Sequence, residues 1–288
     1  MRSRSLPSAF GRRCNRVERR VTTGEDQRLL QELTAAMGEG RPVVLATVVS
    51  TKRSVPRHAG TKMLVYADGS LRGTVGGGAM ESRVIDAAHD SMATGRTQLL
   101  SYELLDPERG DPGVCGGEVQ IYLEPYMPPH TVFVIGAGHV GKAVVELAHW
   151  LGYRTVISDD RADRVTGETM PLADERIAGN VAEALEAHPV TADTSIVVVT
   201  RDTGIDVAAI PLLLATPARY LGVMGSERRW LTTRRQLVDR GVPEADLDRI
   251  QVPVGIELGA ETVEEIAVSI LSQVIRVTRT APGSGDAA

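Results

Sequence analysis

Aromatic residues, cysteines and long apolar runs are all scarce in this chain of 288 residues. With only two Trp, two Phe and six Tyr, the core must be aliphatic, and a nucleic-acid surface built from stacking aromatics is disfavoured. Two cysteines are too few for a disulfide framework. No uncharged apolar run approaches about 18 residues, which excludes a membrane-spanning helix. We therefore expect a soluble, cytoplasmic protein with no membrane partner.

Lysine is also rare, and the charge is divided unevenly along the chain. Arg outnumbers Lys 29 to 3, and residues 1–20 hold seven Arg against one acidic residue, a net charge of +6. The overall charge of −5 then leaves −11 for the remainder, which disfavours nucleic acid as a partner. The basic segment is either a transit peptide or nucleic-acid arm, or a disordered leader or a start codon assigned too far upstream. We favour a disordered basic leader over residues 1–23, because the segment has no apolar stripe.

The clearest domain boundary is a proline cluster at residues 125–129, because clustered prolines disrupt helices and central strands. We expect an α+β domain over residues 24–127, a second domain over 131–280 and a disordered tail over 281–288. In the first domain, apolar spacing predicts helices, and β-branched runs with a hairpin signal at Asp68 and Gly69 predict strands. The predicted helices span 26–37 and 80–93, and the predicted strands span 43–51, 62–66, 71–75, 97–103 and 118–123.

The second half of the chain alternates apolar strands with amphipathic helices, which is typical of a parallel sheet covered on both faces. The predicted strands span 131–135, 154–158, 194–200 and 220–224, and the predicted helices span 139–151, 181–187, 206–215 and 227–240. A last helix follows a capping box formed by Thr262 and Glu265. The expected fold class is α/β, with a C-terminal Rossmann-type doubly wound parallel sheet preceded by the smaller α+β domain.

A glycine-rich turn joins the first strand of this second half to its first helix. Gly136 permits the tight turn, Gly138 lets a pyrophosphate approach the backbone, and Gly141 allows close packing of helix and strand. Asp159 follows the next strand, 23 residues after the first glycine, where it can accept from a ribose hydroxyl and favour NAD over NADP. The alternative is a Rossmann fold that keeps these glycines for packing and binds no dinucleotide.

Other polar residues follow strands at the same predicted sheet edge. His139, inside the glycine turn, is either a solvent-facing helical residue or a donor to an anionic ligand. Arg201 and Arg228 are candidate phosphate or carboxylate contacts, although most surface arginines are simply solvated.

The first domain has its own glycine-rich segments. Gly76, Gly77 and Gly78 precede a helix and form either an anion cradle or merely a tight turn. Arg57 and Glu81 flank this region and either contact a ligand or pair with each other. Cys115 lies between glycines, where access is easy and nearby N–H groups can stabilise a thiolate, so we expect it to be reactive or ligating.

Several common catalytic motifs are missing. The sequence has no HExxH, no paired CxxC and no Cys/His cluster with zinc spacing. It also has no GxSxG and no Walker-type GxxxxGK[ST]. These absences argue against hydrolase and kinase functions.

Taken together, the motifs resemble the XdhC/CoxI family, the xanthine dehydrogenase accessory proteins. The resemblance covers the chain from about Leu29 to Arg276. The segments that support it are 43–49, 54–57, 60–65, 73–81, 114–117, 134–141, 159–161, 220–226, 253–255 and 264–270. One departure stands out: position 79 is Ala where some relatives have Cys, which argues against a mechanism with two thiols in this region.

The resemblance implies a chaperone that binds molybdenum cofactor of the molybdopterin type as cargo. Such proteins support sulfuration of the cofactor by a cysteine desulfurase and deliver it to the large subunit of a molybdenum hydroxylase such as xanthine dehydrogenase. Carried over by position, Cys115 would contact molybdenum or a transferred sulfur, and Arg57 and the glycine loops would hold the pterin or its phosphate. The candidate cofactor-binding residues are Cys115, Arg57, Gly76, Gly77, Gly78, Glu81, Gly136, Gly138, His139, Gly141, Asp159, Arg161 and Ser226.

Two rival functions remain open at this point. One is an oxidoreductase that binds NAD(P) or another nucleotide in the Rossmann domain, although no Tyr-xxx-Lys pair supports it. The other is a scaffold that bridges the desulfurase and the hydroxylase, with Cys115 only structural. In each case a homodimer is the default expectation.

Overall fold

The computed structural model describes residues 24–104 and 116–279, and the chain divides into two compact units, Met1–Pro128 and Pro129–Ala288. Each unit has its own sheet and its own hydrophobic cores. The leader and tail expected from the sequence, and Cys115, lie outside the described residues.

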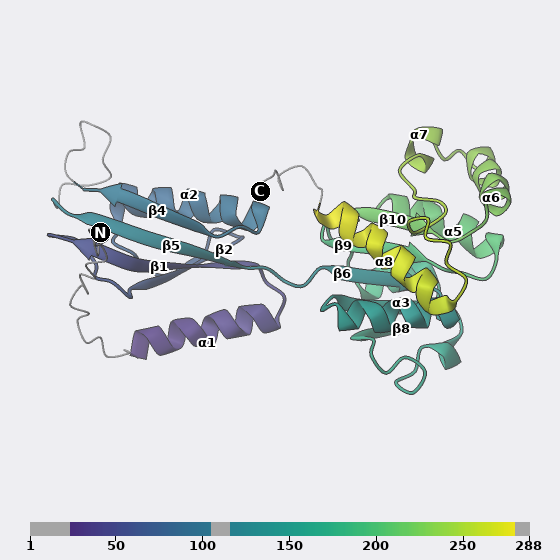
Figure 1. Ribbon diagram of the computed structural model, residues 1–288, viewed down its shortest axis with the longest axis horizontal. Helices are drawn as coiled ribbons and strands as arrows, with labels where there is room; N and C mark the ends of the chain where they lie inside the picture. Colours follow the sequence, from purple (N-terminus) through teal and green to yellow (C-terminus); the bar gives the residue numbers. More distant parts are fainter. Residues whose placement is uncertain (1–23, 105–115, 280–288) are drawn as a thin grey trace, which may run out of the picture. The chain divides into compact units, whose positions relative to one another are not determined.

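The N-terminal unit is built on an antiparallel sheet of five strands (Figure 1). The strands are β1 (Val43–Lys52), β2 (Lys62–Tyr66), β3 (Leu71–Gly73), β4 (Gln98–Glu103) and β5 (Glu118–Tyr126), in the order β3-β2-β1-β5-β4. Because neighbouring strands are antiparallel, β1, β3 and β4 run in the same direction. The loops that follow these three strands therefore leave the sheet at the same end.

One helix covers each face of this sheet. Figure 1 shows α1 (Gly24–Gly38) on one side and α2 (Gly78–Thr94) on the other. The alternating side chains of β1 explain this arrangement, because successive residues of a strand point to opposite faces. Val44 and Ala46 belong to the core that contains Val84 of α2, whereas Val43 belongs to the core that contains Leu33 of α1.

The C-terminal unit contains a parallel sheet of five strands. The strands are β6 (Thr131–Ile135), β7 (Arg154–Asp159), β8 (Glu175–Ala178), β9 (Thr194–Val198) and β10 (Tyr220–Val223), in the order β10-β9-β6-β7-β8. The chain moves outward from β6 to β8 and then crosses to the other side of β6 to form β9. The strand order thus reverses between β6 and β9, which creates a crevice at the carboxyl ends of these two strands.

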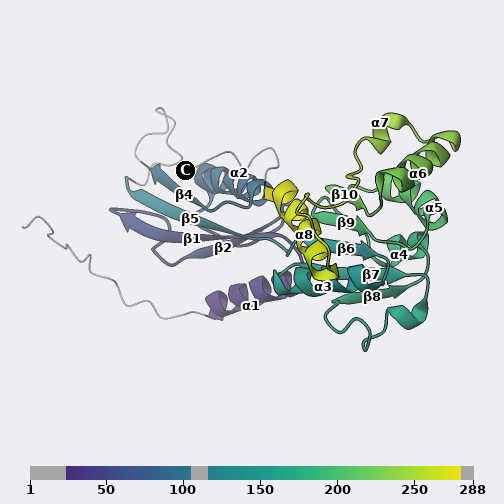
Figure 2. The same cartoon turned by 45° about the vertical axis from the view of Figure 1, so that its right-hand side comes forward.

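Helices cover both faces of the parallel sheet. They are α3 (His139–Trp150), α4 (Val181–Ala187), α5 (Thr203–Leu214), α6 (Glu227–Asp239), α7 (Glu244–Leu247) and α8 (Val263–Arg279). Helices α3 and α8 contribute Val144 and Ile270 to one core, and α8 lies against α3 in Figures 1 and 2. Helices α4, α5 and α6 contribute Ala184, Ile210 and Leu237 to the other core. The predicted doubly wound α/β fold is confirmed.

The sequence-based assignment misses the short elements and overextends some of the strands. It does not find β8, α7 or the 3-10 helix Ala162–Arg164, and it extends β3 and β9 two residues beyond their ends at Gly73 and Val198. The capping box at Thr262 is confirmed, because its Oγ1 accepts from the Glu265 N–H at 3.2 Å and the Glu265 carboxylate accepts from the Thr262 N–H at 2.9 Å. Within residues 24–104 and 116–279, no helix has the length and apolar character needed to cross a membrane.

Candidate functional site

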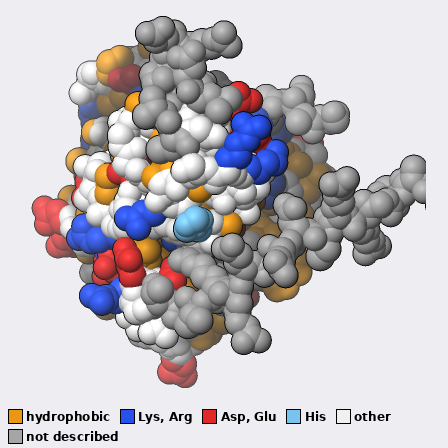
Figure 3. All heavy atoms as spheres, turned by 90° about the vertical axis from the view of Figure 1, so that its left-hand side faces the viewer, with side chains coloured by type: hydrophobic (Ala, Val, Ile, Leu, Met, Phe, Trp, Pro, Cys, Tyr) orange, Lys and Arg blue, Asp and Glu red, His pale blue; other side chains and the backbone are white. Residues whose placement is uncertain are grey.

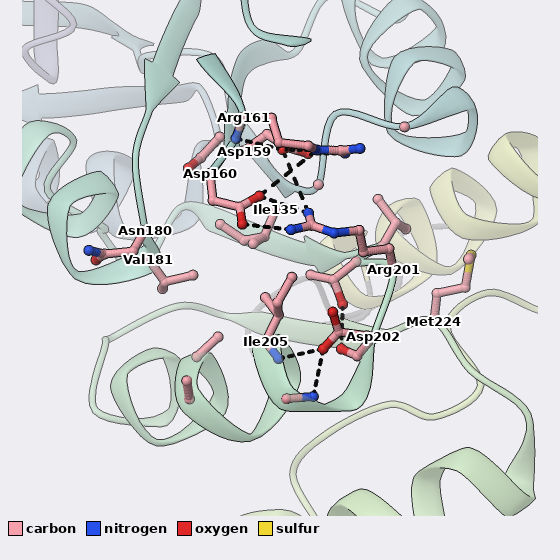
Figure 4. Close-up of a pocket in the computed structure, with 18 of the residues that line it drawn as sticks. Ile135, Asp159, Asp160, Arg161, Asn180, Val181, Arg201, Asp202, Ile205 and Met224 are labelled. Carbon is pink, nitrogen blue, oxygen red and sulfur yellow. Dashed lines mark hydrogen bonds and ion pairs between the residues drawn. The ribbon is translucent and has the colours of Figure 1, made fainter. Parts of the chain in front are cut away.

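A cavity of about 730 Å³ opens at the carboxyl edge of the parallel sheet (Figure 4). It is formed by the residues that follow β6, β7, β8, β9 and β10, and one residue of α8 completes its wall. This is the crevice where the strand order reverses, the position at which open α/β sheets bind their ligands. Gly136, Gly138, His139, Asp159 and Arg161, all predicted from the sequence, line the cavity.

The three glycines of the turn after β6 meet different demands. A Cβ at Gly136 would lie 2.7 Å from the carbonyl oxygen of Val199, and a Cβ at Gly141 would collide with the carbonyl oxygen of Gly136. Packing therefore explains these two glycines. Gly138 differs, because its φ is −82° and a Cβ there would meet nothing within 4 Å. Its bare backbone leaves room beside the cavity for an approaching ligand.

Two further features of the cavity favour a polar ligand. The N-cap of α3, Gly138, supplies no side-chain cap, so the first N–H groups of this helix lack a capping acceptor and add a positive dipole. Ser158 also lines the cavity; it is 1% exposed, and its Oγ has no hydrogen-bond partner among the described residues. A buried hydroxyl of this kind is costly unless a ligand or water pairs with it.

Asp159, at the end of β7, is enclosed by donors from its own chain. Its Oδ2 accepts from the Ala137 N–H at 2.7 Å and from Arg161 Nη2 at 2.9 Å. Its Oδ1 accepts from the Arg161 N–H at 3.0 Å and from Arg161 Nε at 2.8 Å. Burial acts to raise the pKa of Asp159, but the hydrogen bonds from Arg161 and Ala137 outweigh it and hold the pKa below its ordinary value.

A second ion pair lies beside the first. Arg201, which follows β9, donates from Nη1 and Nη2 to the two carboxylate oxygens of Asp160 at 2.8 and 2.7 Å. The hydrogen bond to Asp160 is the main cause that raises the pKa of Arg201. Figure 4 shows Arg201 reaching across the crevice to this carboxylate, with Val181 and Ile205 on the opposite side of the open space.

The remaining residues predicted for this unit have different positions. His139 is exposed and begins α3 at the edge of the cavity. Ser226 is the N-cap of α6, where its side chain accepts from the Arg229 N–H at 3.3 Å, and it does not line the cavity. Arg228 is also exposed and outside the lining.

The N-terminal unit gathers its predicted residues at one end of the sheet. The loop after β1 includes Pro56, which lies close to Gly76, because a Cβ at Gly76 would be 2.9 Å from Pro56 Cγ. Gly117 packs against the same loop, since a Cβ there would be 2.7 Å from the carbonyl oxygen of Lys52 and would collide with that of Ser54. Three sequence-distant motifs therefore meet here. Cys115, two residues before Gly117, lies outside the described part of the chain.

The triple-glycine turn holds an anion, and that anion is the protein's own. Oε2 of Glu81 accepts from the Val75 and Gly77 N–H groups at 3.2 Å each, and also from the hydroxyl of Thr74. Gly77 and Gly78 have φ values of 78° and 66°, a backbone conformation that favours glycine. Glu81 therefore pairs with the turn, and not with Arg57 as the sequence left open.

Basic side chains are exposed at this end of the N-terminal unit. Figure 3 looks onto it and shows Lys, Arg and His side chains, with Asp and Glu side chains near some of them, around a surface of small and uncharged groups. Residues 52–61 contain Lys52, Arg53, Arg57 and His58 and no acidic residue, and all four are exposed. Arg57 makes no ion pair or hydrogen bond with any described residue. The described residues hold no group of three or more His, Cys, Asp or Glu with the geometry of a metal site.

Sequence reasoning missed two features of the candidate site. Ser158 is hidden in an apolar strand, and its only signal is a hydroxyl directly before Asp159. The pairing of Arg201 with Asp160 joins residues 41 positions apart, and only the parallel arrangement of β7, β6 and β9 brings them together.

Comparison with known proteins gives a consistent match for both units. The XdhC Rossmann domain model matches residues 132–274, and the XdhC and CoxI family model matches residues 36–103. A protein named YqeB from Escherichia coli is 32% identical over 84% of this chain and 44% of its own length. The chain thus spans less than half of that relative.

Two other relatives match almost end to end. The molybdenum cofactor insertion chaperone PaoD of Escherichia coli is 21% identical, over 91% of this chain and 92% of PaoD. The crystal structure of a xanthine dehydrogenase from Bacillus halodurans, 22% identical, covers 89% of this chain and 97% of that chain with a TM-score of 0.50, and it shows a shared fold. With both family models matched in order along it, the chain belongs to the XdhC and CoxI family.

Proposed function

We propose that the protein is an accessory protein that binds molybdenum cofactor, supports its sulfuration and delivers it to a molybdenum enzyme. Family membership and the name of the relative PaoD support the cofactor as cargo. The structural observation that carries the proposal is the meeting of three motifs at one end of the N-terminal sheet. These are the loop after β1, the triple-glycine turn and Gly117.

This end of the sheet is suited to an anionic cargo. Arg57 is exposed, and no described residue neutralises it, so its guanidinium is available to a phosphate or a pterin oxygen. Arg53 and His58 add donors in the same loop. The Gly77 N–H already has Glu81 as an acceptor, and the Gly76 N–H has the Thr74 hydroxyl, so we assign the first contact with the cargo to Arg57 and not to the glycine turn.

Cys115 is the proposed contact for molybdenum or for the transferred sulfur. Both elements are thiophilic, which suits a thiolate ligand. The described residues on either side of the segment that contains Cys115 pair with each other, because Gly116 N–H donates to the Leu104 carbonyl at 2.6 Å and Leu104 N–H donates to the Gly117 carbonyl at 2.8 Å.

The test is retention of molybdenum and pterin by anaerobically purified protein that has been exposed to released cofactor. We expect near-stoichiometric retention by the wild type and by Cys14→Ala, and loss in Cys115→Ala. Cys14 is the matched control, because it is the other of the two cysteines in the chain. Equal retention by both variants would remove Cys115 from the site, and no retention by any of the three proteins would overturn the chaperone proposal.

The proposed partners are the large subunit of a molybdenum hydroxylase such as xanthine dehydrogenase, and a cysteine desulfurase. Cofactor insertion requires a receiving enzyme, and sulfuration requires a sulfur donor. We further propose that the protein is a cytoplasmic homodimer, and that each subunit consists of two domains, residues 24–127 and 131–280. Co-purification of tagged protein with each partner, with and without cofactor, and light scattering of the purified protein test these assignments.

A second candidate function belongs to the C-terminal unit, namely binding of a nicotinamide or other nucleotide, with oxidoreductase activity as its strongest form. The cavity over Gly138 favours it, because packing does not explain this glycine and Ser158 Oγ is left without a partner among the described residues. Calorimetric titration with nicotinamide nucleotides tests the binding, and absence of any heat signal would remove this candidate.

A further inference from the structure

Asp159, the acidic residue at the end of β7, has no free acceptor position for the hydroxyl of a ribose. In Rossmann sites this carboxylate accepts from the ribose 2′-hydroxyl, whereas a nearby arginine accommodates a 2′-phosphate. An ionised carboxylate offers about four acceptor positions. Asp159 uses four of them on the Ala137 N–H and on the N–H, Nε and Nη2 groups of Arg161. A hydroxyl donor from a ribose would have to displace one of these bonds.

Two guanidinium groups lie where the ribose would be recognised. Arg201 Nη1 is 4.0 Å from Asp159 Oδ1, and Arg161 Nε is 3.9 Å from Asp160 Oδ1, so both arginines share the two carboxylates. Arg161 Nη1 and Arg201 Nε donate to no described residue. The arrangement thus presents N–H groups at the cavity edge that suit an oxyanion.

Asp160 and Asp159 are not equivalent partners. The Asp160 side chain is 45% exposed and pairs with Arg201, whose side chain is also 45% exposed, whereas the Asp159 side chain is 3% exposed. The exposed pair of Arg201 and Asp160 is in contact with water, so it is weak and a ligand can replace one partner. The buried Asp159 carboxylate does not exchange its partners so easily. A dianionic phosphate has more charge and more acceptor atoms than a carboxylate, so it can replace Asp160 on Arg201 with bidentate geometry.

The rest of the cavity fits the other parts of a nucleotide. The uncapped N-terminus of α3 and the open backbone at Gly138 suit a diphosphate, and the unpaired Ser158 hydroxyl is buried in the same wall. On the other side of the open space lies an apolar surface that suits a planar base (Figure 4). It is formed by Val181, Ala182, Ile205, Ala208 and Leu212.

We propose that this cavity selects a nucleotide that carries a phosphate monoester on its ribose, and that Arg201 and Arg161 hold this phosphate in place of the Asp160 carboxylate. The inference rests on the second candidate function, nucleotide binding by the C-terminal unit, and goes beyond it by naming the group that is recognised. It differs from the preference for NAD that the sequence position of Asp159 suggests, and the titration below decides between them.

The test is calorimetric titration of the full chain with NADP⁺ and with NAD⁺, which differ only in the 2′-phosphate. We expect NADP⁺ to bind at least about tenfold more tightly, the effect of one charge-assisted hydrogen bond. Arg201→Gln should reduce the ratio of the NADP⁺ affinity to the NAD⁺ affinity to near one. Asp160→Asn, which removes the competing carboxylate, should increase the ratio.

Arg164→Gln is the matched control, because Arg164 is an exposed arginine of the same segment that does not line the cavity. It should leave both affinities unchanged. If it changed the affinity ratio as much as Arg201→Gln does, the preference for NADP⁺ would come from the overall positive charge of the segment and not from a specific contact with Arg201. Equal binding of the two nucleotides, or tighter binding of NAD⁺, would overturn the inference while nucleotide binding stands. Binding of neither would overturn both, and the cofactor-retention test decides the chaperone function separately.

Discussion

Two glycines of one turn illustrate how differently single residues are constrained. We expect Gly141→Ala to destabilise the C-terminal unit by about 2–3 kcal/mol, because its Cβ would collide with the Gly136 carbonyl oxygen in a helix that cannot move away cheaply. Gly138→Ala should leave stability unchanged or slightly higher, because its φ of −82° and open surroundings accept a Cβ. Thermal unfolding followed by circular dichroism measures both. A loss of stability in Gly138→Ala would contradict this assignment of roles.

His130 gives the C-terminal unit a pH-dependent stability. Burial lowers the pKa of His130 to about 4, and its ring contacts Ser195 Oγ at 2.8 Å and the edge of Tyr153. In the unfolded chain the histidine has its ordinary pKa of about 6.5, so as the pH falls below this value the unfolded chain binds a proton while His130 in the folded unit stays neutral. The free energy of unfolding is therefore highest above pH 6.5 and decreases between pH 6.5 and 4. We expect a decrease of about 1–2 kcal/mol, less than the full shift in pKa would give, because water reaches part of the ring.

Urea unfolding at several pH values checks this effect. His130→Gln, which keeps a polar partner for Ser195, should lose less stability than the wild type as the pH falls from 6.5 to 4. His149→Gln is the matched control, because His149 is exposed at the end of α3. An unchanged pH profile in His130→Gln would exclude His130 as its source.

At the scale of elements, a buried ion pair joins α5 to α6. Asp206 is 1% exposed, and its carboxylate accepts from Arg229 Nη2 at 2.6 Å and from the hydroxyl of Thr200. Asp206→Asn leaves the Arg229 charge without its counter-charge, so we expect a destabilisation of about 3 kcal/mol. Arg154→Gln, which breaks the exposed pair with Glu175, should cost less than about 0.5 kcal/mol. Denaturant unfolding of the two variants compares these values, and equal effects would show that burial is not decisive.

The long elements of both units are predictable from the sequence, because their periodicity reflects burial. Even the seven-residue helix over Val181–Ala187 is predicted with its observed bounds, and Asn180 caps it through the N–H groups of Ala182 and Glu183. Strand β8 escapes prediction because it has four residues, two of them charged, and pairs only with β7 at the sheet edge. Short charged edge strands have no pattern that separates them from loops.

The candidate sites are predictable only in part. The positions of Gly136, Gly138 and Asp159 follow from spacing, because a strand, a turn and a helix must follow one another there. What those residues contact does not follow from spacing. Arg161 donates to the acceptor positions of Asp159, and Glu81 accepts from N–H groups of the glycine turn in the other unit. In both cases a side chain that is local in sequence folds back onto the polar group that a ligand would otherwise contact.

At the scale of the whole molecule, the two units should fold as separate pieces. Each has its own sheet and cores, so residues 24–127 and 131–280 should each unfold cooperatively when expressed alone. The first piece should keep the cofactor retention and the second the nucleotide binding. A piece that ends at residue 103 is the control, because it lacks β5, the strand between β1 and β4, and it should not fold. Failure of either complete piece to fold would contradict this independence.

In the proposed carrier without cargo, Glu81 already pairs with backbone N–H groups of the glycine turn. A pocket with empty amides would hold its cargo tightly, because releasing the cargo would leave buried donors without acceptors. In this turn the carboxylate of Glu81 already accepts from the Val75 and Gly77 amides, so a cargo held by Arg57 does not need them. Departure of the cargo would thus leave neither of these two donors unpaired. A protein built in this way favours fast hand-over to an enzyme with a deeper site, and it sacrifices affinity to achieve it.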